Sequence, residues 1–185
     1  MKFILGKKLG MTTIHGEEGA ENVTLVECGA KVSLILEKEK NGYNAVQLER
    51  QKTKNKTVKV EFRVDETDLK KDAMIEVSDF QKGDIVKIGG IAKAKGFQGV
   101  VKRYNFKGGP ASHGGKHNLR QPGAIGSGFP EHVIKGKRMA GRMGGKRTTS
   151  ENIKIVYIDK EKKILGLKGA VPGNPGNIVE IRSVE

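Results

Sequence analysis

The chain has 185 residues, a formal net charge of +14 at pH 7 and a single cysteine, Cys28. One cysteine rules out an intrachain disulfide and a zinc site built from cysteines, and no apolar run approaches the roughly 20 residues of a membrane-spanning helix. Such a basic balance indicates a polyanionic partner, with nucleic acid ahead of an anionic membrane surface.

Apolar, β-branched runs in the first half of the chain predict short strands at residues 2–5, 11–15, 23–28 and 32–37. Residues 3–5 are too short an apolar stretch for a signal peptide, so we expect a cytoplasmic location. Asn41-Gly42 lies between residues 31–40 and 43–50, which is the strongest short-range signal for a β-hairpin.

Further along, residues 58–64 alternate between apolar and charged side chains, as a half-buried strand does. The polar residues 65–73 are compatible with a helical turn. More strands are predicted at residues 85–88, 153–158, 164–168 and 178–181, with a loop at residues 172–176. This spacing predicts a small closed barrel or a sandwich, formed by residues 1–92 and 148–185 as one discontinuous domain.

The excess positive charge lies between residues 93 and 147. This basic segment holds 13 Lys and Arg residues and one acidic residue, Glu131, so its net charge is +12, whereas the other 130 residues carry +2. It also holds 13 of the 26 glycines. It has too few large apolar residues to form a core alone. A disordered insertion and an extension that orders on RNA are both compatible with this composition. The interior position and the scattered aromatic residues favour the extension.

The basic segment contains no recognisable catalytic constellation. His113 and His117 are four residues apart, but the two glycines between them disfavour the helix that a zinc-binding pair needs. The glycine-rich stretches 96–99 and 141–145 lack the Walker spacing, and Glu131 has no acidic partner nearby in the sequence. We therefore expect no enzyme activity, no metal, no cofactor and no small-molecule substrate.

The same segment is well suited to RNA. Lysine and arginine meet phosphates, arginine with two hydrogen bonds, and glycine lets the backbone approach a crowded surface. Phe97, Phe106 and Phe129 are candidates for stacking on bases. For Phe97, which precedes a predicted strand at residues 99–104, packing of the loop against the β domain is an equally good interpretation.

Several motifs in a fixed order resemble the family of universal large-subunit ribosomal protein three, in its bacterial form, over nearly the whole chain. The most specific is Lys95-Gly96-Phe97-Gln98-Gly99-Val100-Val101-Lys102-Arg103, followed by Phe106. The others are Gly6-Lys7-Lys8-Leu9-Gly10-Met11-Thr12, Ser112-His113-Gly114, Pro122-Gly123-Ala124-Ile125-Gly126, Lys135-Gly136-Lys137-Arg138-Met139-Ala140-Gly141-Arg142-Met143-Gly144 and Lys168-Gly169-Ala170-Val171-Pro172-Gly173.

This resemblance implies a mainly β fold: a six-stranded barrel of the translation-protein type with a long, basic, irregular extension inserted between strands. It also implies a structural constituent of the large ribosomal subunit that binds 23S-type rRNA early in assembly, beside neighbouring large-subunit proteins. The tip of the extension, about residues 123–131, would lie near the peptidyl transferase centre. A cytoplasmic ribosome is expected, and an organelle ribosome stays open.

The chain departs from the family pattern in three places. Ala94 stands where relatives often have glycine, which indicates that this turn tolerates a Cβ. Ser127 and Gly128 stand near the position of a glutamine that is methylated in some bacterial relatives, so we do not expect that modification. Residues 51–57 form a shorter stretch than in relatives, with a peripheral helix expected to be missing.

Two other functions were weighed: an RNA-modifying or RNA-processing enzyme with a basic guide loop, and a free nucleic-acid chaperone. The enzyme would need clustered His, Asp or Glu, which the motifs lack. The residues predicted to contact RNA share a basic, polar, aromatic or glycine character within or beside these motifs. They are Lys93, Lys95, Gly96, Phe97, Gln98, Gly99, Lys102, Arg103, Phe106, Lys107, Ser112, His113, Gly114, Lys116, His117, Arg120, Gln121, Ser127, Phe129, His132, Lys135, Lys137, Arg138, Met139, Arg142, Lys146 and Arg147.

Overall fold

The structure, a computed structural model, describes residues 2–16, 19–65 and 69–184. These residues form two compact units. Unit 1 comprises the described residues up to 93 and from 146 onward, and unit 2 comprises residues 94–145. The chain leaves unit 1 after strand β7 and re-enters it at strand β10.

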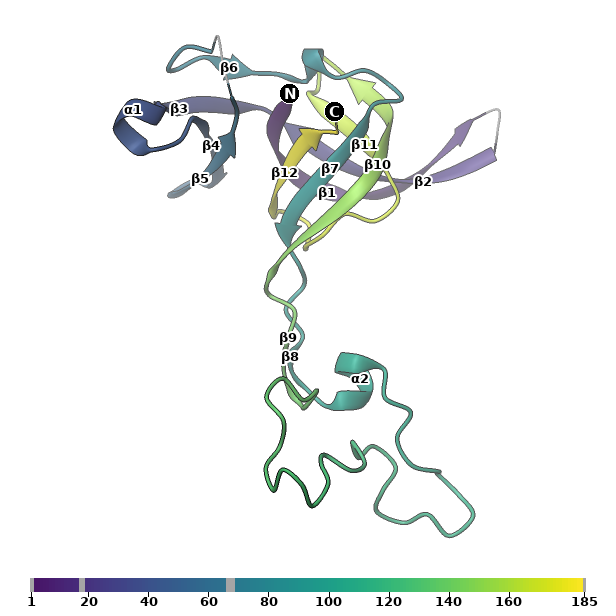
Figure 1. The fold of residues 1–185 in the computed structure, drawn as a ribbon. Coiled ribbons are helices and arrows are strands. Elements are labelled where there is room, and N and C mark those ends of the chain that lie inside the picture. Colours follow the sequence, from purple (N-terminus) through teal and green to yellow (C-terminus); the bar gives the residue numbers. More distant parts are fainter. Residues whose placement is uncertain (1, 17–18, 66–68, 185) are drawn as a thin grey trace. The chain divides into compact units, whose positions relative to one another are not determined.

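Six strands in the described part of unit 1 close into a barrel (Figure 1). All neighbours are antiparallel, in the order β1, β12, β7, β10, β11, β2 and back to β1. The strands are β1 (Phe3–Gly16), β2 (Gly19–Cys28), β7 (Ile85–Ile91), β10 (Arg147–Asp159), β11 (Ile164–Lys168) and β12 (Ile178–Ser183). The mainly β class predicted from the alternating runs is confirmed.

The barrel core is built from alternate residues of its strands. Val86 and Ile88 of β7 and Val179 and Ile181 of β12 are completely buried. Fully burying a side chain of this size stabilises the fold by about 1.5–3 kcal/mol. Because aromatic residues are scarce, aliphatic side chains supply most of this core.

Glycine is required where two barrel strands approach most closely. A Cβ on Gly6 of β1 would lie 2.2 Å from Cγ1 of Val26 on β2. A Cβ on Gly166 of β11 would lie 2.8 Å from Cβ of Tyr157 on β10. Neither position has room for a side chain unless a neighbouring strand moves.

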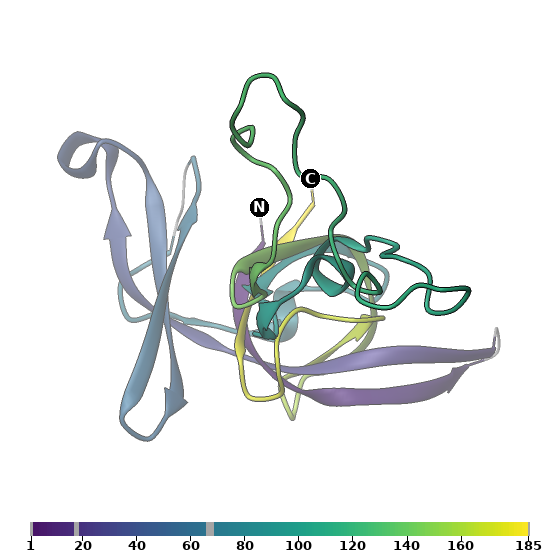
Figure 2. The same cartoon turned by 90° about the horizontal axis from the view of Figure 1, so that it is seen from below.

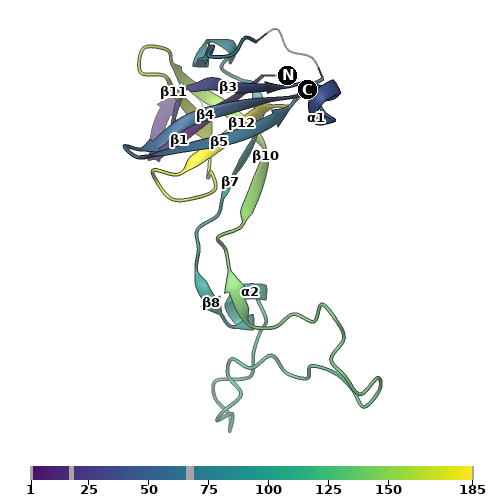
Figure 3. The same ribbon diagram turned by 90° about the vertical axis from the view of Figure 1, so that its left-hand side faces the viewer.

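A second sheet of unit 1 has the order β5, β4, β3, β6 (Figure 3). Its strands are β3 (Ala30–Leu36), β4 (Ala45–Thr53), β5 (Lys56–Arg63) and β6 (Met74–Ile75), and a 3-10 helix, η1 (Val77–Asp79), follows β6. Phe62 of β5 stacks on Phe3 of β1, with 4.9 Å between ring centroids. Val32 and Leu48 belong to the same buried cluster as the barrel residues, so the sheet and the barrel share one core.

Two predictions for the N-terminal part need correction. The separate strands predicted at residues 2–5 and 11–15 are one continuous strand, β1. The register shifts between Lys8 and Gly10, and β1 stays paired with β2 on both sides of this irregularity. β1 and β2 together form a long two-stranded ribbon, whose strands run side by side toward the right of Figure 2 (purple).

The hairpin predicted around Asn41-Gly42 exists, but its turn does not have two residues. β3 pairs with β4 from Leu36↔Ala45 onward. The connection contains a one-turn helix, α1 (Lys38–Asn41), which Gly42 ends with a φ of 81° and a hydrogen bond from its N–H to the carbonyl of Lys38. Of the helical turn expected in residues 65–73, residues 66–68 lie outside the described residues, and the remainder forms a turn at residues 71–72.

The remaining strand predictions in unit 1 are confirmed. Residues 58–64, 85–88, 164–168 and 178–181 coincide closely with β5, β7, β11 and β12, and residues 153–158 lie within the longer β10. In β5 the alternation holds residue by residue, since Phe62 is buried and Lys59, Glu61 and Arg63 are exposed. Residues 172–176 form the predicted loop.

Unit 2 has little regular structure. It contains a two-stranded ribbon, β8 (Gly96–Gln98) with β9 (Gly141–Met143), and a short helix, α2 (Val100–Tyr104). The strand predicted at residues 99–104 is therefore wrong. Gly99 is extended and accepts a hydrogen bond at its carbonyl from the N–H of Arg103, and Asn105 ends the helix with a φ of 59°. No helix among the described residues is long and apolar enough to cross a membrane.

Candidate nucleic-acid interface

The β8–β9 ribbon is the base of unit 2. Phe97 lies opposite Arg142 in its register, and the N–H of Lys95 donates to the carbonyl of Met143 at 2.9 Å. The side chain of Gln98 donates to the carbonyl of Lys95. Phe97 is 77% exposed, so most of its ring is accessible to a partner.

A cluster around Tyr104 joins the two ends of the irregular loop. Arg103 lies over the Tyr104 ring with its Cζ 4.9 Å from the centroid, and Arg138 approaches the same ring at 5.7 Å. Phe106 is tilted against Tyr104 at 6.3 Å. Nη1 of Arg103 donates to the carbonyl of Met139 at 2.6 Å. The outgoing helix thus holds the returning chain through an arginine and an aromatic ring.

Tyr104 was not among the residues predicted to contact RNA. It is half-buried, and its ring organises two of the predicted arginines. In the sequence, Tyr104 stands between Lys102-Arg103 and Phe106. The strand predicted at residues 99–104 gave no reason to place the tyrosine ring against the arginines, whereas the helix found there does.

The first part of the irregular loop folds back on itself. The N–H of Gly109 lies 3.1 Å from the carbonyl of Asn118 and 3.2 Å from that of Leu119. A Cβ on Gly108 would lie 2.2 Å from the Leu119 carbonyl oxygen. A hollow of about 380 Å³ opens here, lined by Phe106, Lys107, Gly108, Gly109, Asn118, Gln121, Pro122 and Gly123.

The two closely spaced histidines are in this loop and are not on a helix. His113 has a φ of 57°, and both His113 and His117 are exposed. Within the described residues, no group of three or more His, Cys, Asp or Glu side chains is arranged to hold a metal ion.

The second part of the loop is exposed throughout. Every residue from 116 to 140 is exposed, including the apolar Ile125 at 42%, Phe129 at 86% and Ile134 at 64%. Its internal hydrogen bonds are local, for example from Oγ of Ser127 to the carbonyl of Phe129 at 2.6 Å. These apolar side chains are accessible to a partner.

The basic side chains of the segment are directed at solvent. Of the thirteen, Arg103 is half-buried and the rest are exposed. Among the described residues, Arg147 is the one member of the thirteen with a carboxylate within ion-pair distance, that of Glu180. This carboxylate raises the pKa of Arg147 above its ordinary value through a hydrogen bond and its charge. The remaining charges are left for an anionic partner.

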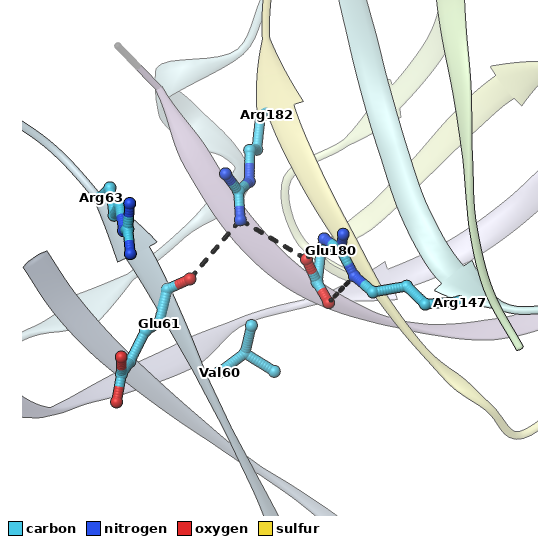
Figure 4. A pocket seen from close by; sticks show the side chains of 6 residues that line it. All are labelled: Val60, Glu61, Arg63, Arg147, Glu180 and Arg182. Carbon is cyan, nitrogen blue, oxygen red and sulfur yellow. Dashed lines mark hydrogen bonds and ion pairs between the residues drawn. The ribbon is translucent and has the colours of Figure 1, made fainter.

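Around Arg147 the surface of unit 1 forms a second hollow, of about 370 Å³, lined by Val60, Glu61, Arg63, Arg147, Glu180 and Arg182 (Figure 4). Glu180 bridges Arg147 and Arg182, the latter at 3.5 Å. Arg182 also donates to the backbone carbonyl of Glu61 at 3.5 Å, and Arg63 lies 5.0 Å from the Tyr43 ring centroid. These arginines already have partners within the protein.

The structure does not bring the predicted RNA-contacting residues into one pocket. Lys93, Lys146 and Arg147 belong to unit 1 and the other predicted residues to unit 2. All 27 are exposed except the partly buried Gln98, Arg103 and Phe106. These side chains are therefore accessible on the surfaces of both units.

Comparisons with a family model and with known proteins all point to one family. A family model described as ribosomal protein L3 matches residues 44–164. Large ribosomal subunit protein uL3 of Finegoldia magna is 41% identical over 98% of this chain and 97% of its own length. The uL3 protein of Dehalococcoides mccartyi strain CBDB1 is 43% identical, covering 97% and 96%. Protein uL3c of Guillardia theta is 40% identical, covering 97% and 98%.

Proposed function

The chain belongs to the ribosomal protein L3 family, and we propose that it binds large-subunit rRNA as a structural constituent of the large ribosomal subunit. This family is structural and its members are not enzymes. The location of the protein is accordingly the ribosome, and its partners are 23S-type rRNA and neighbouring large-subunit proteins.

The observation that carries this proposal is the exposed basic surface of residues 93–147. Its thirteen basic residues are opposed by a single carboxylate within the segment, which leaves a net charge of +12, and twelve of the thirteen basic side chains are exposed. Exposed lysine and arginine side chains without an acidic partner bind phosphates favourably, because each contact releases counterions condensed on the nucleic acid.

The aromatic and apolar side chains of unit 2 suit RNA better than duplex DNA. Phe97 and Phe129 are the most exposed large apolar residues of the described chain, at 77% and 86%. RNA loops and bulges present unstacked bases on which such rings can stack. Phe97 lies across from Arg142, and Phe129 lies near the middle of the exposed stretch.

The finer features of the family follow as parts of the same proposal. The barrel is of the translation-protein type. As domains we propose a discontinuous β domain of residues 1–92 and 148–185 and a basic RNA-binding segment of residues 93–147. The protein acts early in subunit assembly, and its extension reaches toward the peptidyl transferase centre with residues 123–131 at the tip.

Sedimentation of a cell lysate tests this function. The protein should co-sediment with large subunits in a fixed ratio to the rRNA. A free nucleic-acid chaperone would remain in the light fractions. Purified protein should also bind large-subunit rRNA more tightly than small-subunit rRNA at the same salt concentration, and equal binding would contradict the assignment.

A further inference from the structure

We infer that the tip of the β4–β5 hairpin in unit 1 is a second RNA-contacting surface, which binds backbone phosphates through Lys52, Lys54 and Lys56. This inference rests on the proposed function, because it names a further contact with the same RNA. The hairpin tip is defined as residues 50–60. None of its residues belongs to the motifs or to the basic segment from which RNA binding was predicted.

The hairpin tip interrupts an otherwise balanced charge pattern. Outside residues 93–147 the chain is nearly neutral, with a net charge of +2 over 130 residues. Residues 50–60 nevertheless hold five basic residues and no acidic one, between Glu49 and Glu61. Charge alone does not make a site, so the local partners of these five side chains decide which are available.

Two of the five are engaged within the protein. Nη1 of Arg50 donates to the carbonyl of Gly29 at 2.5 Å, and Nη2 forms an ion pair with Glu27 at 3.2 Å. The Arg50 side chain is only 11% exposed. Lys59 lies 3.7 Å from the carboxylate of Glu49. Arg50 therefore fixes the hairpin to the barrel, and Lys59 is neutralised across the strands.

The other three are presented at the end of the hairpin. β4 ends at Thr53 and β5 begins at Lys56, so the turn consists of Lys54 and Asn55. Lys54 and Lys56 are exposed, and no carboxylate of the described residues lies within ion-pair distance of either. Nζ of Lys52 has a neutral partner, Oδ1 of Asn177 at 3.4 Å. Three positive charges without a carboxylate partner thus lie in the turn and in the two strand ends beside it.

A phosphate backbone is the partner that this chemistry fits best. No large apolar side chain within the hairpin tip is exposed in the described structure, which leaves no anchor for a membrane surface or for the core of a protein interface. Lysine is depleted from protein interfaces, whereas it is a common point contact for phosphate. The arginine hollow of Figure 4 is a weaker candidate, because Glu180 and the Tyr43 ring already engage its guanidinium groups.

A charge-matched pair of variants in the full chain tests the inference. Lys54→Gln/Lys56→Gln removes two uncompensated charges, and Lys38→Gln/Lys40→Gln removes two charges of α1 beside Glu37 and Glu39, with Lys40 already paired to Glu37 at 3.5 Å. All four lysines are exposed, and they lie at the β3–β4 and β4–β5 connections of the same sheet. The measurement is filter binding to a full-length large-subunit rRNA transcript across a salt series, with circular dichroism to verify folding.

The hairpin-tip variant should weaken binding and make log K less steep against log salt by about 0.7–0.9 for each phosphate that it no longer neutralises. The α1 variant should keep the wild-type slope. Equal slopes in all three proteins, or equal decreases in both variants, would overturn the inference. An unchanged slope with poorer incorporation of the hairpin-tip variant into subunits would also overturn it and indicate an acidic protein partner. Failure of the wild-type protein to bind the transcript would instead refute the proposed function.

Discussion

Lys8 holds the loop at one end of the barrel through the carbonyl of Val171: its Nζ donates to that oxygen at 2.7 Å and to the carbonyl of Gly173 at 3.1 Å. The residue is only 6% exposed. Two backbone acceptors are thus satisfied by one buried ammonium group. Lys8 is part of the N-terminal motif of residues 6–12, and its buried position makes it a structural residue.

Lys8→Met should lower the free energy of unfolding by about 1–3 kcal/mol, because both carbonyls then lose their donor in a buried position. Burial and the charge of Lys93 lower the pKa of Lys8 below its ordinary 10.5. The unfolded chain therefore binds more protons than the native chain just below pH 10.5, and stability rises with pH in that window. Urea unfolding of both proteins between pH 7 and 10.5 measures this. The wild-type advantage should grow toward the alkaline end, and a constant difference would contradict the assignment.

Cys28 should be chemically silent in the folded protein. It is 2% exposed, and burial raises the pKa of its thiol to about 12, whereas the thiolate is the reactive form. Iodoacetamide at pH 8 should label it only in urea. Cys28→Ala should leave RNA affinity unchanged and cost about 1–2 kcal/mol of stability through the cavity. Rapid labelling under native conditions would show that this strand opens.

Arg103→Lys should weaken RNA binding although the charge is kept. The guanidinium lies over Tyr104 and donates to the carbonyl of Met139, and lysine cannot do both. The loss of one hydrogen bond that orders the loop costs about 1 kcal/mol, which corresponds to a loss of RNA affinity of roughly fivefold. Arg63→Lys is the matched control, because Arg63 also lies over a tyrosine ring, 5.0 Å from the Tyr43 centroid, but outside the residues predicted to contact RNA. If both variants bind alike, the cluster around Tyr104 does not organise the interface.

Binding of the whole protein to large-subunit rRNA should depend steeply on salt. If residues 93–147 neutralise about 6–10 phosphates, the affinity should fall by roughly 10³–10⁵ between 50 and 200 mM salt, with the duplex-DNA relation as a guide. A filter-binding titration gives the slope directly. A flat profile would mean that the exposed charges do not meet phosphates.

Replacing residues 99–140 with a short Gly/Ser turn should leave unit 1 folded and abolish correct assembly into subunits. The replaced stretch lies between Gln98 and Gly141, which are paired in the β8–β9 ribbon, so a tight turn can join them. Removal of like charges should keep or raise the stability of the remainder. Circular dichroism and urea unfolding test the fold, and sucrose gradients test assembly. An unfolded product would show that unit 2 supports the core.

The sequence predicted most strands of unit 1 well, because their signal is local. In β5, Val58 to Phe62 alternate between the two faces of the strand whatever their partners are. Predictions failed where a distant partner or a backbone conformation decides the outcome. Val100-Val101 suggested a strand by their β-branching, but the left-handed conformation of Asn105 closes a helical turn there. No local pattern shows that Tyr104 meets Arg138, or that Lys8 is buried under a loop more than 160 residues away.

The exposure of most residues predicted to contact RNA could be expected from composition, because an unpaired basic side chain on an irregular segment usually lies in solvent. The hairpin tip at Lys54 and Lys56 could not be found in this way. In the sequence, five basic residues within 50–60 are typical of an ordinary exposed strand. The structure shows that Arg50 and Lys59 are paired with carboxylates and that the other three are not.

The exposure of every residue from 116 to 140 also bears on the lifetime of the protein before assembly. Proteases bind their substrates as accessible, extended backbone, and chain segments without buried contacts are the preferred sites of cleavage. A copy whose loop is not covered by a partner is open to cutting there, while its barrel stays closed. We therefore expect surplus copies to be degraded from this loop, so that the amount of the protein in the cell follows the amount of the partner that covers it.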